Sequence, residues 1–474
     1  MTAKADERFP PLRALGISVM PGYLQSEGVD AVLGRFVGMA KATDVTFYPK
    51  LLEPAPDGQG VRHPPHDGDA GHVRLFDRPV WGRREFWARS HSSYVPDMAL
   101  FAGQRYRPNP ATALTEREGG LVRDFVERAA AAGLNVHLQM PATIPETDGH
   151  EAGPQPDDLP RLPDGRIPEM QVDRFGSLAS EDILAFGAAR VVDLARAYPQ
   201  VATIRLDWPE MPPYTVDNVF CDFSDHARRV APELGFDFER MRADAGVVYS
   251  ALHGHLPDVL KTWDAGGATA ILERWPGLGE LFAFKRALAV RLVQRYRGAL
   301  DDAGLGHVGL IPQGFPAPWN HLSGFDYTAL APLSAALAVK LYTMHWPMMV
   351  RYHARPMVEN NPGIAEADVV ERLVRAFDLT EPDAPFDARA FAYPDPDTPH
   401  PVSSGAMTRK ARAARAATPP ETPLLALTHS YGPLSDFQRR LGATLAGGVD
   451  RVWIQRYSYL SDEKLAWLGS LPRA

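Results

Sequence analysis

The segment TIRLDWPEMPPY (203–214) places two carboxylates, Asp207 and Glu210, directly after a run of apolar residues. A carboxylate at the end of a buried strand is costly unless it has a partner or a task. Arg205, two residues before Asp207, projects from the same side of a strand and could keep that carboxylate ionised. Hydrolysis of glycosides uses two carboxylates, one as acid and one as nucleophile or base. The spacing therefore predicts a glycoside hydrolase with Asp207 as nucleophile or base and Glu210 as acid.

Polar and aromatic side chains recur where the other apolar runs of the chain end. Aromatic rings pack against the C–H faces of sugars, while amides and charged groups bind sugar hydroxyls. The sequence therefore predicts a rim that binds a saccharide or a glycoconjugate, with Arg205 contributing to it. The other predicted substrate-binding residues are Trp208, Gln313, Lys340, Tyr342, His345, His429, Tyr431, Asp436 and Arg456. Asp436 is also a rival second carboxylate, although its place in the first turn of a helix fits capping.

Each candidate also has another explanation. Arg205 and Asp207 can form an ion pair that only closes the end of a barrel, and Glu210 can fix the turn that follows. Lys340 supports different chemistry, because a desolvated lysine inside a barrel can form a Schiff base with a carbonyl substrate, as in a lyase or an aldolase. A third alternative is a non-catalytic sugar-binding barrel, since no carboxylate ends the predicted fifth or seventh strand.

No metal and no cofactor are predicted. His345 and His429 could bind a divalent ion together with a carboxylate, but the first predicted strand has no H-x-H and the chain has no H-E-x-x-H. The single cysteine, Cys221, excludes a framework of disulfides and a cysteine-based zinc site. Nothing around Cys221 resembles the signature of a cysteine enzyme.

Short apolar runs alternate with segments of helical periodicity along the whole chain. Eight such runs, each followed by helical or loop material, predict a closed parallel (β/α)8 TIM barrel. An open doubly wound sheet fits less well, because no G-x-G-x-x-G follows the first run. The predicted strands are 15–20, 44–49, 135–140, 202–208, 307–315, 336–346, 423–432 and 451–460.

Residues 1–474 are predicted to form a single barrel with long insertions after strands 2, 3 and 4. Residues 50–114, 141–179 and 209–280 all follow strand carboxyl ends, which is the face where barrel active sites lie. The segment 380–422 precedes strand 7 and contains a basic, alanine-rich run. The segment is predicted to be a loop or mobile segment on the opposite face or around the side, and its basic run a solvated helix or a mobile loop, with a partner-binding arm as the alternative.

Composition limits the classes of protein to consider. The chain has 50 basic and 58 acidic residues and a net charge of -8, which argues against a nucleic-acid-binding protein. No stretch approaches 18 uninterrupted apolar residues, so no membrane span is predicted. The first 20 residues lack the apolar core of a signal peptide, which predicts a cytoplasmic protein. The 44 prolines indicate rigid loops, and the oligomeric state is not predicted.

A family resemblance rests on several segments. They are SSYVPDMALFAGQRYRPNP, GLNVHLQM, YPQVATIRLDWPEMPPY, THSYGPLSDF and DRVWIQRYSYLSDEKL. Together they resemble glycoside hydrolase-like (β/α)8 barrel proteins. The R-x-D of Arg205 and Asp207 is similar to that of the α-amylase superfamily, where this Asp is the nucleophile and a Glu after strand 5 is the acid. Here Gln313 ends strand 5, and strand 7 ends in THSYG without the nucleophilic Glu of another clan. The resemblance therefore implies the fold and a carbohydrate substrate, and it leaves the mechanism open.

Overall fold

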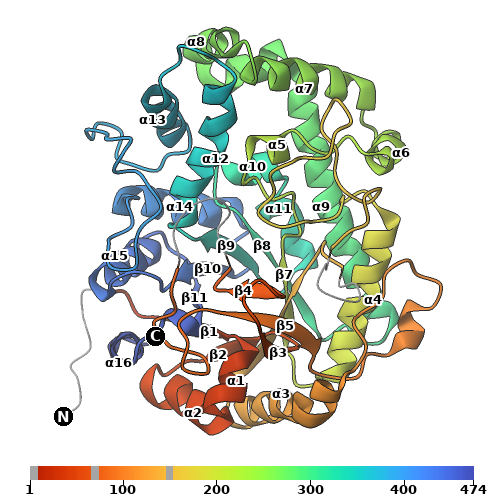
Figure 1. Cartoon of the computed structure of the whole chain (residues 1–474), viewed down its shortest axis with the longest axis vertical. Helices are drawn as coiled ribbons and strands as arrows, with labels where there is room; N and C mark the ends of the chain where they lie inside the picture. The colour runs from red at the N-terminus through yellow and green to blue at the C-terminus, as the bar shows by residue number, and fades with distance from the viewer. Residues whose placement is uncertain (1–8, 66–73, 146–152) are drawn as a thin grey trace.

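Eight of the strands bond side by side into a closed parallel barrel, which confirms the predicted (β/α)8 fold (Figure 1). The computed structural model describes residues 9–65, 74–145 and 153–474. The order around the barrel is β1-β11-β10-β9-β8-β7-β6-β2. The strands are β1 (Leu15–Val19), β2 (Asp44–Phe47), β6 (Asn135–Pro141), β7 (Thr203–Asp207), β8 (Gly309–Gly314), β9 (Leu337–Leu341), β10 (Leu424–His429) and β11 (Arg451–Gln455).

The centre of the barrel is filled by side chains from alternate strand positions. A Cβ on Gly16 would lie 2.2 Å from the ring of Trp453, so only glycine leaves room for this large side chain. Ile311, Ala338 and Leu427 belong to the same buried cluster as Trp453. Two residues further along the strands, the same inward face carries Gln139, Asp207, Gln313, Lys340 and His429. The packed centre thus gives way to a polar layer at the carboxyl ends of the strands, called the barrel mouth below.

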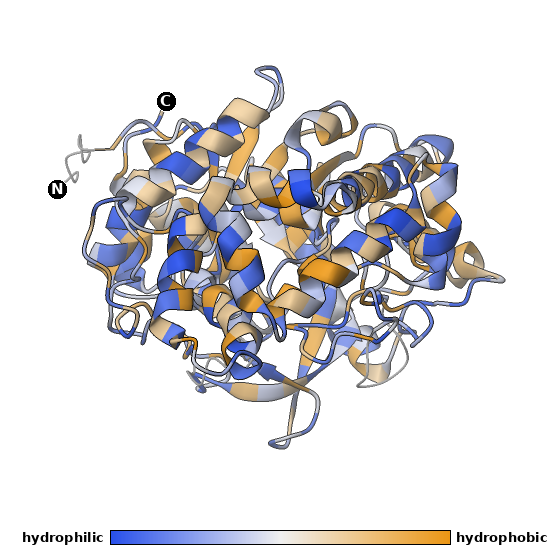
Figure 2. Ribbon diagram, turned by 90° about the horizontal axis from the view of Figure 1, so that it is seen from above, coloured by the Kyte–Doolittle hydropathy of each residue, from blue (hydrophilic) through white to orange (hydrophobic). Residues whose placement is uncertain are grey.

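Helices surround the barrel, and hydrophobic and hydrophilic residues lie beside one another along their ribbons (Figure 2). The buried core includes many apolar residues of these helices. The helices next to the strands are α1 (Pro21–Glu27), α2 (Val29–Leu33), the π-helix η1 (Gly34–Met39), α3 (Ala113–Ala131), α4 (Glu181–Ala197), α9 (Pro276–Asp302), α14 (Ser404–Ala417), α15 (Leu434–Leu445) and α16 (Asp462–Ser470). Helix α4 begins where Ser180 accepts a hydrogen bond from Ile183 N, and Glu181 and Asp182 complement the positive end of its dipole. None of the described helices combines the length and the apolar character that a membrane crossing requires.

The segment after β2 forms a small antiparallel sheet of order β3-β5-β4. Its strands are β3 (Lys50–Ala55), β4 (Val61–His63) and β5 (Phe86–Ser92), and the turn η2 (Met98–Phe101) follows. Side chains from β3, β4 and β5 line one cavity together with residues at the ends of β1, β2, β6 and β11. The small sheet therefore covers part of the barrel mouth, as its place in Figure 1 also indicates. Residues 66–73 and 146–152, which belong to two predicted insertions, lie outside the described residues.

The segments after β7, β8 and β9 add further helices. After β7 come α5 (Val216–Val219), α6 (Asp225–Glu233), α7 (Phe238–Leu252) and α8 (Leu256–Arg274); after β8 come α10 (Trp319–Ser323), α11 (Tyr327–Leu330) and η3 (Ala331–Leu333); after β9 come α12 (His345–Glu359) and α13 (Glu366–Ala376); after β11 comes η4 (Tyr457–Tyr459). In Figure 1, α7, α8 and α13 lie together at the end of the molecule far from α1 and α2. The molecule is thus enlarged on the side of β7 to β9.

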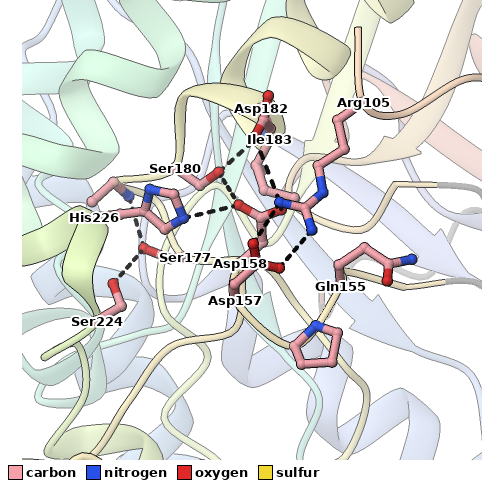
Figure 3. A network of polar contacts seen from close by, with 12 residues as sticks. Arg105, Gln155, Asp157, Asp158, Ser177, Ser180, Asp182, Ile183, Ser224 and His226 are labelled. Atoms are coloured by element: carbon pink, nitrogen blue, oxygen red, sulfur yellow. Dashed lines mark hydrogen bonds and ion pairs between the residues drawn. The ribbon is translucent and has the colours of Figure 1, made fainter.

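A buried acid, Asp158, ties the segment between β6 and α4 to its surroundings (Figure 3). Its carboxylate lies 3.1 Å from His226 Nε2 of α6 and accepts a hydrogen bond from Tyr106 at 2.6 Å. Ser180, the residue that caps α4, also donates to it, and Arg105 lies 3.2 Å away. One carboxylate therefore joins four separate parts of the chain.

One strand differs from its predicted bounds, and one segment from its predicted solvation. The sequence predicts that the sixth strand runs to Trp346, but the strand ends at Leu341. The chain then turns, with His345 N donating to Tyr342 O, and α12 begins at His345. Within 380–422, Ser404–Ala417 forms α14, which agrees with the helical interpretation of the basic run. This helix is not fully solvated, because Ala406, Ala411, Ala414 and the whole side chain of Lys410 are buried.

The chain just before α14 also lies on a different face from the one predicted. His400 is buried beside Tyr431, which follows β10, and its Nδ1 is 2.7 Å from Thr343 Oγ1, which follows β9. Both contacts belong to the carboxyl side of the barrel. The chain around His400 therefore lies at the mouth before α14 begins at Ser404.

Candidate functional site

Asp207 is the last residue of β7 and lies at the barrel mouth. Its Oδ1 is 2.9 Å from Lys340 Nζ, and Gln139 Nε2 donates a hydrogen bond to its Oδ2 at 3.1 Å. Thirty-five per cent of its side chain is exposed, whereas the side chain of Lys340 is 2% exposed. The carboxylate is thus oriented by a buried cation and an amide, and it still faces solvent.

Glu210 lies on the other side of the same lysine. Lys340 Nζ is 3.9 Å from Glu210 Oε1, so the two predicted carboxylates share one ammonium group. Phe315 N donates to Glu210 at 3.1 Å, the Ser323 hydroxyl donates as well, and the side chain has no exposed surface. Burial raises the pKa of Glu210 to about 7, against the opposing effects of Lys340 and Ser323. The structure brings Glu210 close to Asp207 but closes it off from solvent.

Arg205 lies one layer deeper in the barrel than Asp207. It donates to Thr46 Oγ1 at 2.7 Å, and its guanidinium lies 5.6 Å from the ring centroid of Trp453. Among the described residues, its Nε and Nη2 have no hydrogen-bond partner. Burial lowers its pKa, while the phenols of Tyr342 and Tyr48 and the carboxylate of Asp207 act in the opposite direction. Arg205 therefore acts on Asp207 through its charge and not through a direct contact.

Trp208 follows Asp207 in a left-handed backbone conformation, with φ of 53°. Such a conformation is uncommon for a large side chain and is maintained only where the surroundings impose it. The indole packs edge-on against Tyr214 and Phe175, with centroid distances of 5.8 and 6.3 Å. The turn thus directs a partly exposed aromatic face to the mouth beside Asp207.

Three predicted ring residues lie close together at the mouth. The ring of Tyr342 is 5.8 Å from those of His345 and His429 and is edge-on to both. Burial lowers the pKa of His429 well below its ordinary value, and the charges of Arg74 and Arg456 add to this effect. His345 Nε2 lies 3.3 Å from Arg74 Nη1. The cluster therefore offers a neutral imidazole and a phenol as possible partners of a ligand.

The remaining predicted residues contribute differently. Gln313 is buried level with Asp207 on the neighbouring strand, and its amide has no hydrogen-bond partner among the described residues. Tyr431 is fully buried and donates to Pro394 O. Asp436 is buried in ion pairs with Arg439 and Arg440. Tyr431 and Asp436 therefore stabilise the loop behind the mouth in this structure, while Gln313 belongs to the polar layer.

A cavity of about 330 Å³ adjoins this layer and contains charged residues that the sequence analysis did not identify. Lys50, His63 and Asp173 line it together with Arg456 and Gln139, the residue that holds Asp207. Burial raises the pKa of Asp173, the ammonium of Lys50 opposes this, and the charge of Asp207 adds to it. Lys50 and His63 lie in a segment predicted to be at the active face, but nothing local in the sequence distinguishes Asp173 from other loop acids.

A larger cavity, of about 1610 Å³, lies elsewhere and includes none of the predicted site residues among its described lining. It extends between α7, α12 and the segment around Met170. Among residues 9–65, 74–145 and 153–474, no three His, Cys, Asp or Glu side chains converge as a metal ion would require. Cys221 is buried, and burial raises the pKa of its thiol. The predicted site residues therefore lie outside this cavity, and most of them are at the barrel mouth.

No protein-family model matches the chain, and no curated protein matches it either. Among solved structures, the glycoside hydrolase domain of PgaB (BpsB) from Bordetella bronchiseptica is 11% identical, covers 95% of each chain and has a TM-score of 0.50. A β-galactosidase from Marinomonas ef1 is 12% identical over 94% of this chain and 54% of its own, with a TM-score of 0.48. The catalytic domain of β-amylase from Paenibacillus polymyxa is 9% identical over 98% of this chain and 96% of its own, with a TM-score of 0.46. The likeness to the PgaB domain is one of fold: a barrel of the kind found in glycoside hydrolases.

Proposed function

We propose that the chain is a glycoside hydrolase whose reaction takes place at Asp207. The observation that carries this proposal is the state of that carboxylate, which is exposed at the barrel mouth while Lys340 and Gln139 fix its two oxygens. A carboxylate oriented in this way beside aromatic side chains suits attack on a sugar carbon or on a water. The fold shared with the PgaB glycoside hydrolase domain agrees with the proposal.

In this proposal Asp207 is the nucleophile or base, and the proton donor is Asp173. Glu210 was the predicted acid, and its pKa of about 7 suits that role, but its side chain has no exposed surface to meet a substrate. Asp173 lines the same cavity as Gln139 and has an exposed side chain that a substrate can reach; desolvation by its surroundings, with the charge of Asp207 adding to it, raises its pKa above that of an ordinary Asp. Glu210 is then a positioning residue that holds Lys340 under Asp207.

Lys340 is a weaker candidate for Schiff-base chemistry in this arrangement. An amine must be accessible before it can attack a carbonyl group. Lys340 Nζ lies 2.9 Å from Asp207 Oδ1, and its side chain is only 2% exposed, so Asp207 stands between the amine and a substrate at the mouth. A lyase would be recognised by a borohydride-trapped adduct on Lys340, and a sugar-binding protein by saccharide binding without turnover.

Three single variants test the roles of the acids on a panel of aryl glycosides. Asp207→Asn is expected to lower kcat by roughly a thousandfold on every substrate while the melting temperature and saccharide binding stay close to those of the parent. Asp173→Asn is expected to slow substrates with poor leaving groups strongly and activated nitrophenyl glycosides much less, because only the former need a proton from the enzyme. Glu210→Gln is expected to affect both kinds of substrate equally.

The leaving-group dependence separates the two candidate acids. If Glu210→Gln, and not Asp173→Asn, shows the selective loss on poor leaving groups, the buried residue is the proton donor and the assignment of Asp173 is wrong. Undiminished hydrolysis by Asp207→Asn would contradict the proposed function itself.

A further inference from the structure

The cavity of about 1610 Å³ is an open groove between α7 and α12. Helix α7 lines it with the small side chains of Ala243, Gly246, Val247 and Ser250, which are spaced as i, i+3, i+4 and i+7 and so lie on one face of the helix. Ala243, Val247 and Ser250 are exposed, so solvent enters the groove. Its volume exceeds the roughly 300–1,000 Å³ of a typical small-ligand site, which favours an extended ligand.

Helix α12 connects the groove to the barrel mouth. His345, Tyr352 and Glu359 are seven residues apart, so they lie along one face of this helix. His345 belongs to the ring cluster at the mouth, whereas Tyr352 and Glu359 line the groove. The helix rises about 21 Å between His345 and Glu359, so the groove leads well away from the mouth. Its far end lies beside the start of α8, where Leu256 N donates to Asn361 Oδ1 at 2.8 Å (Figure 1).

A second segment also joins the groove to the mouth. Met170, Gln171 and Val172 line the groove, and Asp173, the next residue, lines the cavity beside the mouth. Gln171 and Asp173 can be at most about 7 Å apart, because only two residues of chain separate them. The charge of Asp207 contributes to the raised pKa of Asp173, so these two acids lie close together. A chain of sugars that passes Asp173 on leaving the mouth therefore enters the groove.

The floor of the groove can bind hydroxyl groups. Gln171 Nε2 is buried and has no hydrogen-bond partner among the described residues. Tyr249 donates to Asp217 Oδ1 at 3.0 Å, and the side chain of Asp217 is 20% exposed, so this carboxylate can accept further hydrogen bonds. An amide donor and a carboxylate acceptor are suited to the hydroxyls of sugar units.

The charge of the lining opposes an acidic ligand. Six carboxylates and three arginines belong to the described lining. Each arginine has one of these acids within 3.8 Å, in the pairs Arg166–Asp164, Arg242–Glu239 and Arg355–Glu359. The other carboxylates are those of Glu169, Asp217 and Asp258. Because acids outnumber cations, uronic acids and sulfated sugars would be repelled.

We propose that this groove binds the sugar units of a polysaccharide that follow the one at Asp207, and that the polysaccharide carries no acidic groups. The proposal rests on the proposed function, which places one sugar at Asp207. It narrows the substrate class from saccharides in general to long chains of neutral or basic sugars.

Calorimetric titration of the full chain carrying Asp207→Asn tests the groove while the ligands stay intact. The ligands are disaccharides and hexasaccharides of glucose, galactose, xylose, N-acetylglucosamine, glucosamine and galacturonic acid. The length preference is the affinity for the hexasaccharide divided by that for the disaccharide of the same sugar. It is expected to reach at least roughly tenfold in at least one neutral or basic series. The galacturonic acid series is expected to show no preference, because the groove repels its carboxylates.

Gly246→Trp is expected to lower the length preference to near one, because the indole fills the groove from α7. A Cβ on Gly246 would meet only Pro163 Cβ, at 3.6 Å, so the helix has room for the substitution. Gly120→Trp, on the exposed side of α3, is the matched control, since a Cβ there meets nothing within 4 Å, and it is expected to keep the full preference. If the melting curve shows that Gly246→Trp does not fold, Ala243→Trp, about one helical turn earlier, tests the same groove.

Four results would overturn the proposal. They are equal affinities for the two lengths in every series, a preference confined to galacturonic acid, a preference that survives the tryptophan on α7, and no saccharide binding at all. A preference that Gly246→Trp removes and Gly120→Trp keeps supports it.

Failure of the groove and failure of the proposed function give different results. Hydrolysis that depends on Asp207 but does not respond to the length of the substrate overturns the groove and leaves the function standing. A length preference that Gly246→Trp removes, in a protein that hydrolyses no glycoside, supports the groove and overturns the function.

Discussion

Lys340 serves two carboxylates that differ in their access to solvent. Asp207 is open at the barrel mouth, whereas Glu210 is enclosed by Phe315 and Ser323 and has a pKa of about 7. The charge of Asp207 is available to a ligand, while a charge on Glu210 is confined in a poorly solvated place. A buried acid of this kind makes the stability of the fold depend on pH.

The free energy of unfolding is expected to fall as pH rises from about 4.5 to about 7, because Glu210 resists ionisation in the folded protein. Because its folded pKa is raised, its contribution is complete below the unfolded pKa of about 4.5 and is lost as pH rises through about 7. Glu210→Gln cannot ionise and therefore removes this loss; its amide oxygen can still accept from Phe315 N, while its NH2 group can donate to Ser323 Oγ. The difference in unfolding free energy between acidic and neutral pH is expected to shrink by up to about 3 kcal/mol, as measured by urea denaturation.

Glu421→Gln serves as the control for Glu210→Gln, because Glu421 is exposed and its substitution leaves the interior unchanged. The expectation for this control is the pH dependence of the parent. If the unfolding free energy of Glu210→Gln changes with pH as steeply as that of the parent, Glu210 ionises in the folded protein at little cost and the expectation is wrong.

The sequence alone predicts that Asp207 ends a strand, but it does not predict that Glu210 is enclosed. An apolar strand that ends in a carboxylate is visible in one line of sequence, because inward and outward positions alternate. The enclosure of Glu210 depends on Ser323 of α10 and on the backbone of Phe315 after β8, both distant in sequence. The position of Asp173 is unpredictable for the same reason, because only the folded chain brings it to the cavity that Gln139 also lines.

At the scale of elements, the segment between β6 and α4 is held by the carboxylate of Asp158. Burial opposes the ionisation of this acid, but hydrogen bonds from His226, Ser180 and Tyr106 outweigh it and lower the pKa to about 2. The hydrogen bond between Asp158 and His226 also raises the pKa of His226. The charge therefore stabilises the junction of α4, α6 and the loop containing Tyr106 (Figure 3).

Asp158→Asn is expected to destabilise the protein at neutral pH by about 3 kcal/mol and to flatten its acid unfolding. Because the folded pKa is lowered, the contribution of Asp158 is present above the unfolded pKa of about 4 and is lost as pH falls towards 2. Urea midpoints at several pH values between these limits measure the effect. Asp157→Asn is the matched neighbour, since Asp157 bonds Arg105 from an exposed position. If the urea midpoints of the two variants change equally as pH falls, Asp158 does not anchor this segment.

The helix α14 shows how a local pattern misleads at this scale. The charges of TRKARAARAA predict a solvated helix or a mobile loop. In the structure Lys410 is buried and donates to Ala317 O and Phe377 O, over the rings of Trp319 and Trp346. The apolar partners come from α10 and α12, so the sequence of the helix contains no sign of them.

At the scale of the whole molecule, one hydrophobic core extends through almost the entire described chain. The same buried cluster includes Leu12 near one end and Leu471 near the other, with residues of the barrel, its helices and the added segments between them. The regular alternation of strands and helices made the barrel predictable. The added helices were not predicted individually, because their positions depend on contacts with each other.

A single cooperative unfolding transition is expected for the full chain, as the proposal of one decorated barrel requires. Far-ultraviolet circular dichroism, tryptophan fluorescence and calorimetry should report coincident midpoints, because the core cluster joins the added segments to the barrel. Two separated transitions would instead indicate that the helices around α7 and α8 unfold as an independent unit.

The closed order of the barrel has a consequence for biosynthesis. β1 pairs with β2 on one side and with β11 on the other. During translation β1 leaves the ribosome long before β11 exists, so one edge of this apolar strand lacks its partner for most of synthesis. Exposed strand edges invite pairing with other chains. We therefore expect overexpression in a foreign host to yield aggregates where this edge stays exposed. Protection of the edge, by a chaperone or by transient contacts, is expected to increase the yield of folded protein.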